Sequence, residues 1–95
     1  MTTYNVRTHD LNVERRQGRP ATLPAVPDMQ FFTVSVGQFG WSVFEHSTGQ
    51  KISQHPIRPR AAAVAAANAR LLNIGLDVAR KTVRRQIEKL GPVNP

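Results

Sequence analysis

Five positively charged side chains fall within one short stretch near the end of the chain, ARKTVRRQIEKLGP at residues 79–92. They are Arg80, Lys81, Arg84, Arg85 and Lys89. Arginine and lysine hold phosphate oxygens through charge-assisted hydrogen bonds, and the planar guanidinium of arginine also matches the edge of guanine. The chemistry that this stretch predicts is recognition of a polyanion, and nucleic acid is the polyanion that we expect first.

Helical spacing separates these cations from the apolar residues of the same stretch. At 100° per residue, Lys81, Arg84 and Arg85 fall on one side of a helix, with Arg80 and Lys89 at its flanks. The opposite side collects the apolar residues Leu76, Ala79, Val83, Ile87 and Leu90. Like charges four residues apart repel, and only Glu88 interrupts the cationic side. We therefore expect an external anion to complete this side of the helix.

The net charge of the chain is concentrated in the same third of the sequence. Thirteen Lys and Arg against six Asp and Glu give +7, and ten of the thirteen are Arg. Residues 58–95 carry +6 of this charge, residues 30–57 carry none and residues 1–29 carry +1. Further candidate contacts to nucleic acid are Arg58 and Arg60 at the rim of the basic helix, and Arg15, Arg16 and Arg19 on an N-terminal arm.

Two helices and a small sheet are predicted to position these residues, which makes the fold α+β. The aromatic and β-branched pattern of residues 30–36 and 41–46, with glycines between them, predicts a β-hairpin, and residues 51–55 could add a third strand. The Ala-rich segment 59–73 predicts a helix that packs on the sheet of residues 30–55 through Val64, Ala67, Leu71 and Ile74. The basic amphipathic helix is expected at 77–90, with Asp77 as its cap.

The first 28 residues differ in composition from the rest. Residues 1–17 are polar, apart from a short alternation at Tyr4 and Val6, and residues 18–28 contain three prolines. Proline fixes the backbone and removes amide donors, so this region is expected to be a polar arm and a Pro-rich linker. The expected domain, a single small α+β unit, is residues 29–95.

Two stretches have patterns similar to known nucleic-acid-binding modules. Residues 69–91 resemble the C-terminal helix-turn-helix of Fis-like bacterial activators, with Asn73 where that pattern has Gly and about four additional residues between its halves. The order of strands followed by RPRAAAVAAANARLL at residues 58–72 resembles double-stranded-RNA-binding domains and the N-terminal domains of tyrosine integrases. The resemblances imply different docking surfaces and assign no family. They agree only on nucleic acid as the class of ligand.

Catalytic and metal-binding patterns are not found in the sequence. His9, His46 and His55 are far apart and lack a neighbouring carboxylate cluster at metal-ligand spacing, and cysteine is absent. No serine lies in a nucleophile motif, and no glycine-rich phosphate loop is present. We therefore expect no enzyme activity, no cofactor and no metal. No apolar run approaches the length of a bilayer span, so we expect no membrane partner. We expect the protein to be cytoplasmic.

The sequence thus predicts a small basic protein that binds nucleic acid, duplex DNA before RNA, as a regulator or accessory factor of a bacterial, plasmid or phage system. The alternative is a protein-interaction or inhibitor module whose basic helix docks on an acidic protein surface. A chain of 95 residues buries a modest share of its surface, so a homodimer also remains open.

Overall fold

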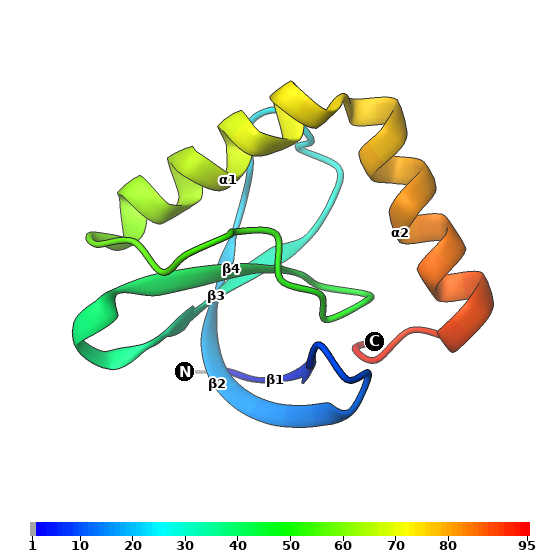
Figure 1. The fold of residues 1–95 in the computed structure, drawn as a ribbon, viewed down its shortest axis with the longest axis horizontal. Coiled ribbons are helices and arrows are strands. Elements are labelled where there is room, and N and C mark those ends of the chain that lie inside the picture. The colour runs from blue at the N-terminus through cyan, green and yellow to red at the C-terminus, as the bar shows by residue number, and fades with distance from the viewer. Residues whose placement is uncertain (1) are drawn as a thin grey trace.

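The computed structural model describes residues 2–95 and consists of a four-stranded antiparallel sheet followed by two helices (Figure 1). The strands are β1 (Thr2–Arg7), β2 (Val13–Ala21), β3 (Phe31–Ser35) and β4 (Trp41–Glu45), and they neighbour one another in sequence order. The helices are α1 (Arg60–Ile74) and α2 (Leu76–Leu90). The predicted α+β class is confirmed.

Residues 2–28 belong to this fold, which corrects the expected polar arm and linker. Thr2–Arg7 pairs with β2, and the last residues of β2 pair with β3. The Pro-rich connection from β2 to β3 contains Leu23 and Val26, which are both fully buried in the core beneath α1. The prolines therefore shape a packed loop rather than a solvated spacer.

Strand β2 bends at Gly18, where it changes partners. Residues up to Gly18 pair with β1, and Arg19 to Ala21 pair with β3. A Cβ atom at Gly18 would lie 2.6 Å from the carbonyl oxygen of Thr33, so only glycine allows this close approach. The bend brings β1 across β3 and β4 on the face opposite α1, where the ring of Tyr4 stacks on Phe32 with centroids 4.1 Å apart.

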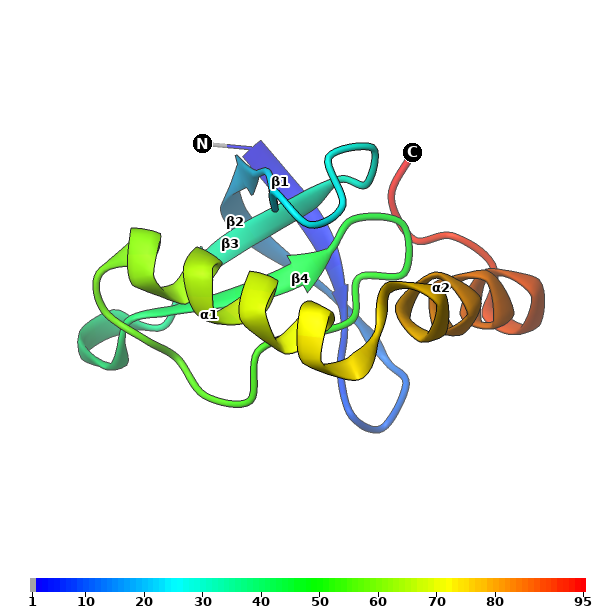
Figure 2. The same cartoon turned by 90° about the horizontal axis from the view of Figure 1, so that it is seen from above.

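Helix α1 covers the other face of the sheet (Figure 2). It buries Ala63, Ala67 and Leu71 against a core that includes Phe31 and Val43. The alanines have little side-chain volume, which lets the helix approach the strands closely. The predicted contact residues Ala67 and Leu71 are confirmed, whereas Val64 is only half-buried and Ile74 is 43% exposed. Relative to the predicted stripe, the buried side of α1 is therefore turned toward Ala63 and away from Val64 and Ile74.

Residues 51–55 do not form the expected third strand of a hairpin sheet. This segment makes single bridges only, Phe44 with Lys51 and, just beyond it, Trp41 with Ile57. The hydroxyl of Ser53 accepts a hydrogen bond from the amide of Val43 at 3.1 Å, so a side chain replaces a ladder contact. Pro56 has no amide to continue the pairing.

Helix α2 follows α1 after one residue, Gly75, whose φ of 102° turns the chain. Asp77 lies in the first turn of α2 but makes no side-chain cap, which corrects its predicted role. Figure 2 shows α2 beyond the edge of the sheet, beside the strands rather than across them. Among residues 2–95, no helix combines the length and apolar character needed to cross a bilayer.

The C-terminal residues pack against β1, near the start of the chain. The side chain of Asn94 accepts a hydrogen bond from the amide of Asn5 at 2.8 Å and donates to the carbonyl oxygens of Asn5 and His46 at 2.8 and 2.7 Å. Asn94 is 7% exposed. We call Asn5, His46 and Asn94 the terminal clasp, because they join the two ends of the fold.

Candidate nucleic-acid interface

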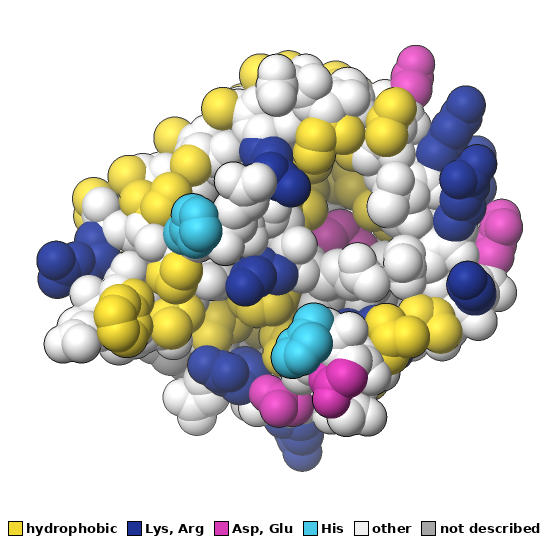
Figure 3. All heavy atoms as spheres, in the orientation of Figure 1, with side chains coloured by type: hydrophobic (Ala, Val, Ile, Leu, Met, Phe, Trp, Pro, Cys, Tyr) yellow, Lys and Arg dark blue, Asp and Glu magenta, His cyan; other side chains and the backbone are white. Residues whose placement is uncertain are grey.

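The outer side of α2 presents four exposed cations, and we call them the α2 cationic face. They are Lys81, Arg84, Arg85 and Lys89. The inner side of α2 buries fewer residues than that of α1. Ala79 is its only buried residue, and Val83 and Ile87 are half-buried. In Figure 3 the basic side chains over α2 form a row along one edge of the molecule. The exposed positions match those predicted for the cationic side of this helix.

Arg80 differs from the other cations of α2, because the protein neutralises it. Its guanidinium donates two hydrogen bonds to the carboxylate of Asp28, at 2.7 and 2.9 Å. This contact holds the pKa of Asp28 down at about 2 and raises the pKa of Arg80. It is the one ion pair among residues 2–95, so Arg84 and Glu88 do not pair at their helical spacing. The expectation that the chain leaves all five cations unneutralised is therefore wrong for Arg80.

Arg60, predicted at the rim of the site, has a structural contact instead. Its Nε donates to the hydroxyl of Thr33 at 2.7 Å, and its Nη2 donates to the carbonyl oxygen of Pro20 at 2.6 Å. Partial burial and the nearby charge of Arg19 lower the pKa of Arg60. The side chain ties the start of α1 to β2 and β3. Arg58, also predicted at the rim, is exposed.

The three arginines predicted on an arm lie on β2 and do not share one face. Arg15 pairs with Asn5 and Arg16 with Tyr4, so their side chains leave the strand on opposite sides. Arg19, opposite Thr33, lies on the side of the sheet that α1 covers. Basic side chains are accordingly scattered over the surface in Figure 3, apart from the row on α2. The structure does not join the ten predicted residues into one surface.

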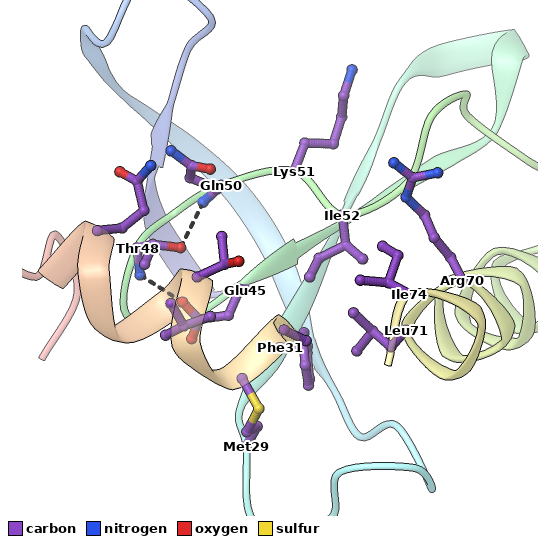
Figure 4. A pocket seen from close by; sticks show the side chains of 14 residues that line it. Met29, Phe31, Glu45, Thr48, Gln50, Lys51, Ile52, Arg70, Leu71 and Ile74 are labelled. Atoms are coloured by element: carbon purple, nitrogen blue, oxygen red, sulfur yellow. Dashed lines mark hydrogen bonds between the residues drawn. The ribbon is translucent and has the colours of Figure 1, made fainter. Parts of the chain in front are cut away.

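A cavity of about 170 Å³ lies beneath α2, and it does not appear among the features that the sequence predicts. It is lined by residues of α1, of α2, of β3 and β4 and of the segment after β4, and Figure 4 shows the side chains around it. One sequence signal was present: Gln86 is a polar residue within the apolar stripe of α2. Nothing in the sequence indicated that Glu45 of β4 and Arg70 of α1 would line the same space.

Histidines and carboxylates do not gather into a metal centre in the described part of the chain. Among residues 2–95, no group of three or more His, Cys, Asp or Glu is placed to hold a metal ion. His46 packs edge-on against Tyr4 and Phe32, and its Nε2 lies 2.6 Å from the carbonyl oxygen of Pro95. The ring of this histidine, whose backbone belongs to the terminal clasp, therefore has structural contacts of its own.

Comparison with protein-family models, with curated proteins and with solved structures found no match to this chain.

Proposed function

We propose that this protein binds nucleic acid, with duplex DNA as the preferred form, through the α2 cationic face. The observation that carries the proposal is the contrast within α2: Arg80 has an internal carboxylate partner, whereas the four cations of the face have none among residues 2–95. All four are exposed. A row of exposed, uncompensated cations on a rigid helix is the electrostatic footprint of a phosphate-binding surface.

The spacing of the face supports a polyanionic ligand. Lys81, Arg85 and Lys89 follow one another at intervals of four residues, where like charges destabilise a helix by a few tenths of a kcal/mol per pair. Phosphate groups close to these side chains would remove the repulsion. A helix of fifteen residues is about 22 Å long, and a major groove admits a helix of this kind.

Phosphate contacts dominate this proposed interface, and no base preference is assigned to it. Arg84 and Arg85 are the central pair, and Lys81 and Lys89 extend the face along the helix. The exposed Arg15, Arg16, Arg19 and Arg58 lie on other elements and serve at most neighbouring phosphates. Such a module fits a small regulator or accessory factor that positions itself on duplex DNA.

The test is a titration of labelled duplex DNA, duplex RNA and single-stranded DNA at low and at moderate salt. We expect saturable binding of duplex DNA at low salt with a micromolar or lower Kd. The variant Arg84→Gln/Arg85→Gln should bind at least about tenfold more weakly, because two charge-assisted phosphate contacts are lost. The matched control is Lys51→Gln/Arg70→Gln, which removes the same charge from another surface and should keep the affinity within about twofold.

Two results would overturn the proposal. One is the absence of saturable binding to any of the three nucleic acids at low salt. If polyglutamate binds under the same conditions and the α2 variant loses that binding, the acidic-protein alternative replaces the nucleic-acid one. The other is an equal loss of DNA affinity in both double variants, which would assign binding to net charge alone. Sedimentation of the free and DNA-bound protein shows whether a monomer or a dimer binds.

A further inference from the structure

The turn between β3 and β4 presents an exposed aromatic ring. Phe39 is 64% exposed, the largest exposed fraction among the large hydrophobic side chains of residues 2–95, and it belongs to neither core cluster. Backbone hydrogen bonds order the turn: the amide of Val36 donates to the carbonyl oxygen of Gly40 at 2.7 Å, and the amide of Phe39 donates to that of Val36 at 3.1 Å. A ligand of this ring would therefore not have to order the backbone that carries it.

Cationic side chains from distant parts of the sequence lie at the same end of the fold. The stem of Arg58 packs against the backbone of Gly40, where a Cβ atom would come within 2.8 Å of its Cγ. Arg58 is exposed and has no ion pair among residues 2–95. Arg19 is also exposed, and it lies near enough to Arg60 that its charge, after burial, lowers the pKa of Arg60. Residues 30–57 have no net charge of their own, so the fold supplies the cationic surroundings of the turn.

This surface is separate from the α2 cationic face. The β3–β4 turn and the start of α1 lie at one end of the molecule and α2 lies at the other (Figure 1, Figure 2), and the longest dimension is 35 Å. In Figure 3 the end with the turn shows basic and hydrophobic side chains and no acidic ones on the visible face. An exposed aromatic ring can stack on a base, and guanidinium groups near it can bind the adjoining phosphates.

We propose that Phe39 stacks on an unpaired base of a single-stranded nucleic acid, whose phosphates are bound by Arg58 and Arg19. The ligand class rests on the proposed function, and the turn adds a second surface to it. Insertion of a ring into a duplex must offset the unstacking of a base step through extended contacts with bent DNA, and α2 is too distant from the turn to provide them. An unpaired base is already free to stack. With both surfaces, the protein would engage nucleic acid where a duplex borders a single strand.

Two single strands of equal length and charge test the stacking contact. One is an oligothymidylate of about ten nucleotides, and the other is an abasic strand with the same number of phosphates. We expect the wild-type chain to bind the oligothymidylate at least about fivefold more tightly at low salt, measured by competition against a labelled oligothymidylate. The ratio of the two Kd values isolates the contacts to bases, because both strands offer the same phosphates.

Variants of exposed residues assign this preference to the ring. Phe39→Ala should bring the two Kd values to within about twofold of each other, and Phe39→Tyr, which keeps a ring, should retain the wild-type ratio. Arg58→Gln should weaken the binding of both strands by a similar factor, because it removes a phosphate contact. The matched control Leu72→Ala truncates a side chain that is 57% exposed near the end of α1, and it should leave the ratio unchanged.

The outcomes distinguish this proposal from the one for α2. Equal Kd values for the two strands in the wild type, or a preference that survives Phe39→Ala, would overturn the stacking contact and favour a protein surface as the occupant of the turn. The preference should persist in Arg84→Gln/Arg85→Gln, and if duplex affinity is also unchanged in that variant, only the α2 proposal is wrong. The absence of saturable binding to any nucleic acid would overturn both.

Discussion

Arg80 and Arg84 lie one helical turn apart on α2, yet their environments differ completely. Arg80 forms a two-fold hydrogen-bonded ion pair with Asp28, while Arg84 is exposed. Spacing along the helix could not separate the two, because the partner of Arg80 comes from a loop 52 residues earlier in the chain. The neutralisation of one arginine defines where the α2 cationic face ends and where α2 is attached to the rest of the fold.

The Asp28–Arg80 pair predicts a specific acid response. Because the pKa of Asp28 is lowered from 3.8 to about 2 in the folded state, the pair stabilises the fold fully above pH 4 and loses its contribution as the pH falls toward 2. Asp28→Asn should therefore lower Tm at pH 6, and its difference from the wild type should shrink between pH 4 and pH 2. Thermal melts monitored by circular dichroism across this range measure the effect.

Glu88→Gln is the control for this experiment, since it removes an exposed carboxylate that has no ion pair within residues 2–95. Its Tm should follow the wild type over the same range. Asp10, whose pKa is lowered chiefly by a hydrogen bond from Thr8, keeps its own contribution in both variants. A constant Tm difference between Asp28→Asn and wild type down to pH 2 would show that the ion pair does not stabilise the fold.

At the level of elements, the sequence predicted β3, β4 and the two helices, whereas it placed the residues of β1 and β2 in a polar arm. The hairpin at 30–36 and 41–46 and the helices at 59–73 and 77–90 agree closely with β3, β4, α1 and α2. Strand β2 has nine residues, of which only Gly18 is buried, so no alternation marks it. Its role comes from pairing on both sides and from a bend that the glycine allows, and neither is a property of its own side chains.

The candidate site, like the fold, could be predicted in part from the sequence. Exposure of Lys81, Arg84, Arg85 and Lys89 follows from helical periodicity, and the structure agrees. The internal contacts of Arg60 and Arg80 were not predictable, since each depends on how α1 or α2 meets a distant loop or strand. The cavity beneath α2 could not be predicted either, because it lies between several elements and a sequence pattern describes each element separately.

The terminal clasp joins β1 and the end of β4 to the C-terminal residues through three hydrogen bonds of one side chain. Asn94→Ala removes three hydrogen bonds and leaves the amide and carbonyl of Asn5 and the carbonyl of His46 without their partner in a partly buried setting. We expect a loss of about 2 kcal/mol in the free energy of unfolding, because unsatisfied buried groups carry a desolvation cost. Urea denaturation measures it.

The matched control for the clasp is Asn73→Ala, at an exposed position near the end of α1, which should change the free energy of unfolding by less than about 0.5 kcal/mol. If the two variants are equally stable, the clasp does not contribute to folding. A confirmed clasp would also show how the chain beyond α2 is anchored, because Val93 and Asn94, three and four residues after the end of the helix, bind β1 and the turn after β4.

For the whole molecule, the decisive quantity is the arrangement of the charge rather than its total of +7. Cations lie on β1, on β2, on α1, after β4 and on α2, and the α2 cationic face is the row among them that has no internal carboxylate partner among residues 2–95. A net positive charge attracts any polyanion, so weak binding to DNA alone would not identify a site. A measurement that counts the charges in contact with phosphate can.

The salt dependence of DNA binding provides that count. For duplex DNA, the logarithm of the binding constant falls with the logarithm of salt concentration by about 0.9 for each phosphate neutralised. Arg84→Gln/Arg85→Gln should therefore reduce this slope by about 1.8, because two contacts and their released counterions are lost. Lys51→Gln/Arg70→Gln lowers the net charge equally and should leave the slope unchanged, since these residues lie outside the face. Equal slopes in the two double variants would mean that DNA senses the overall field of the protein, and α2 would then have no privileged role in binding.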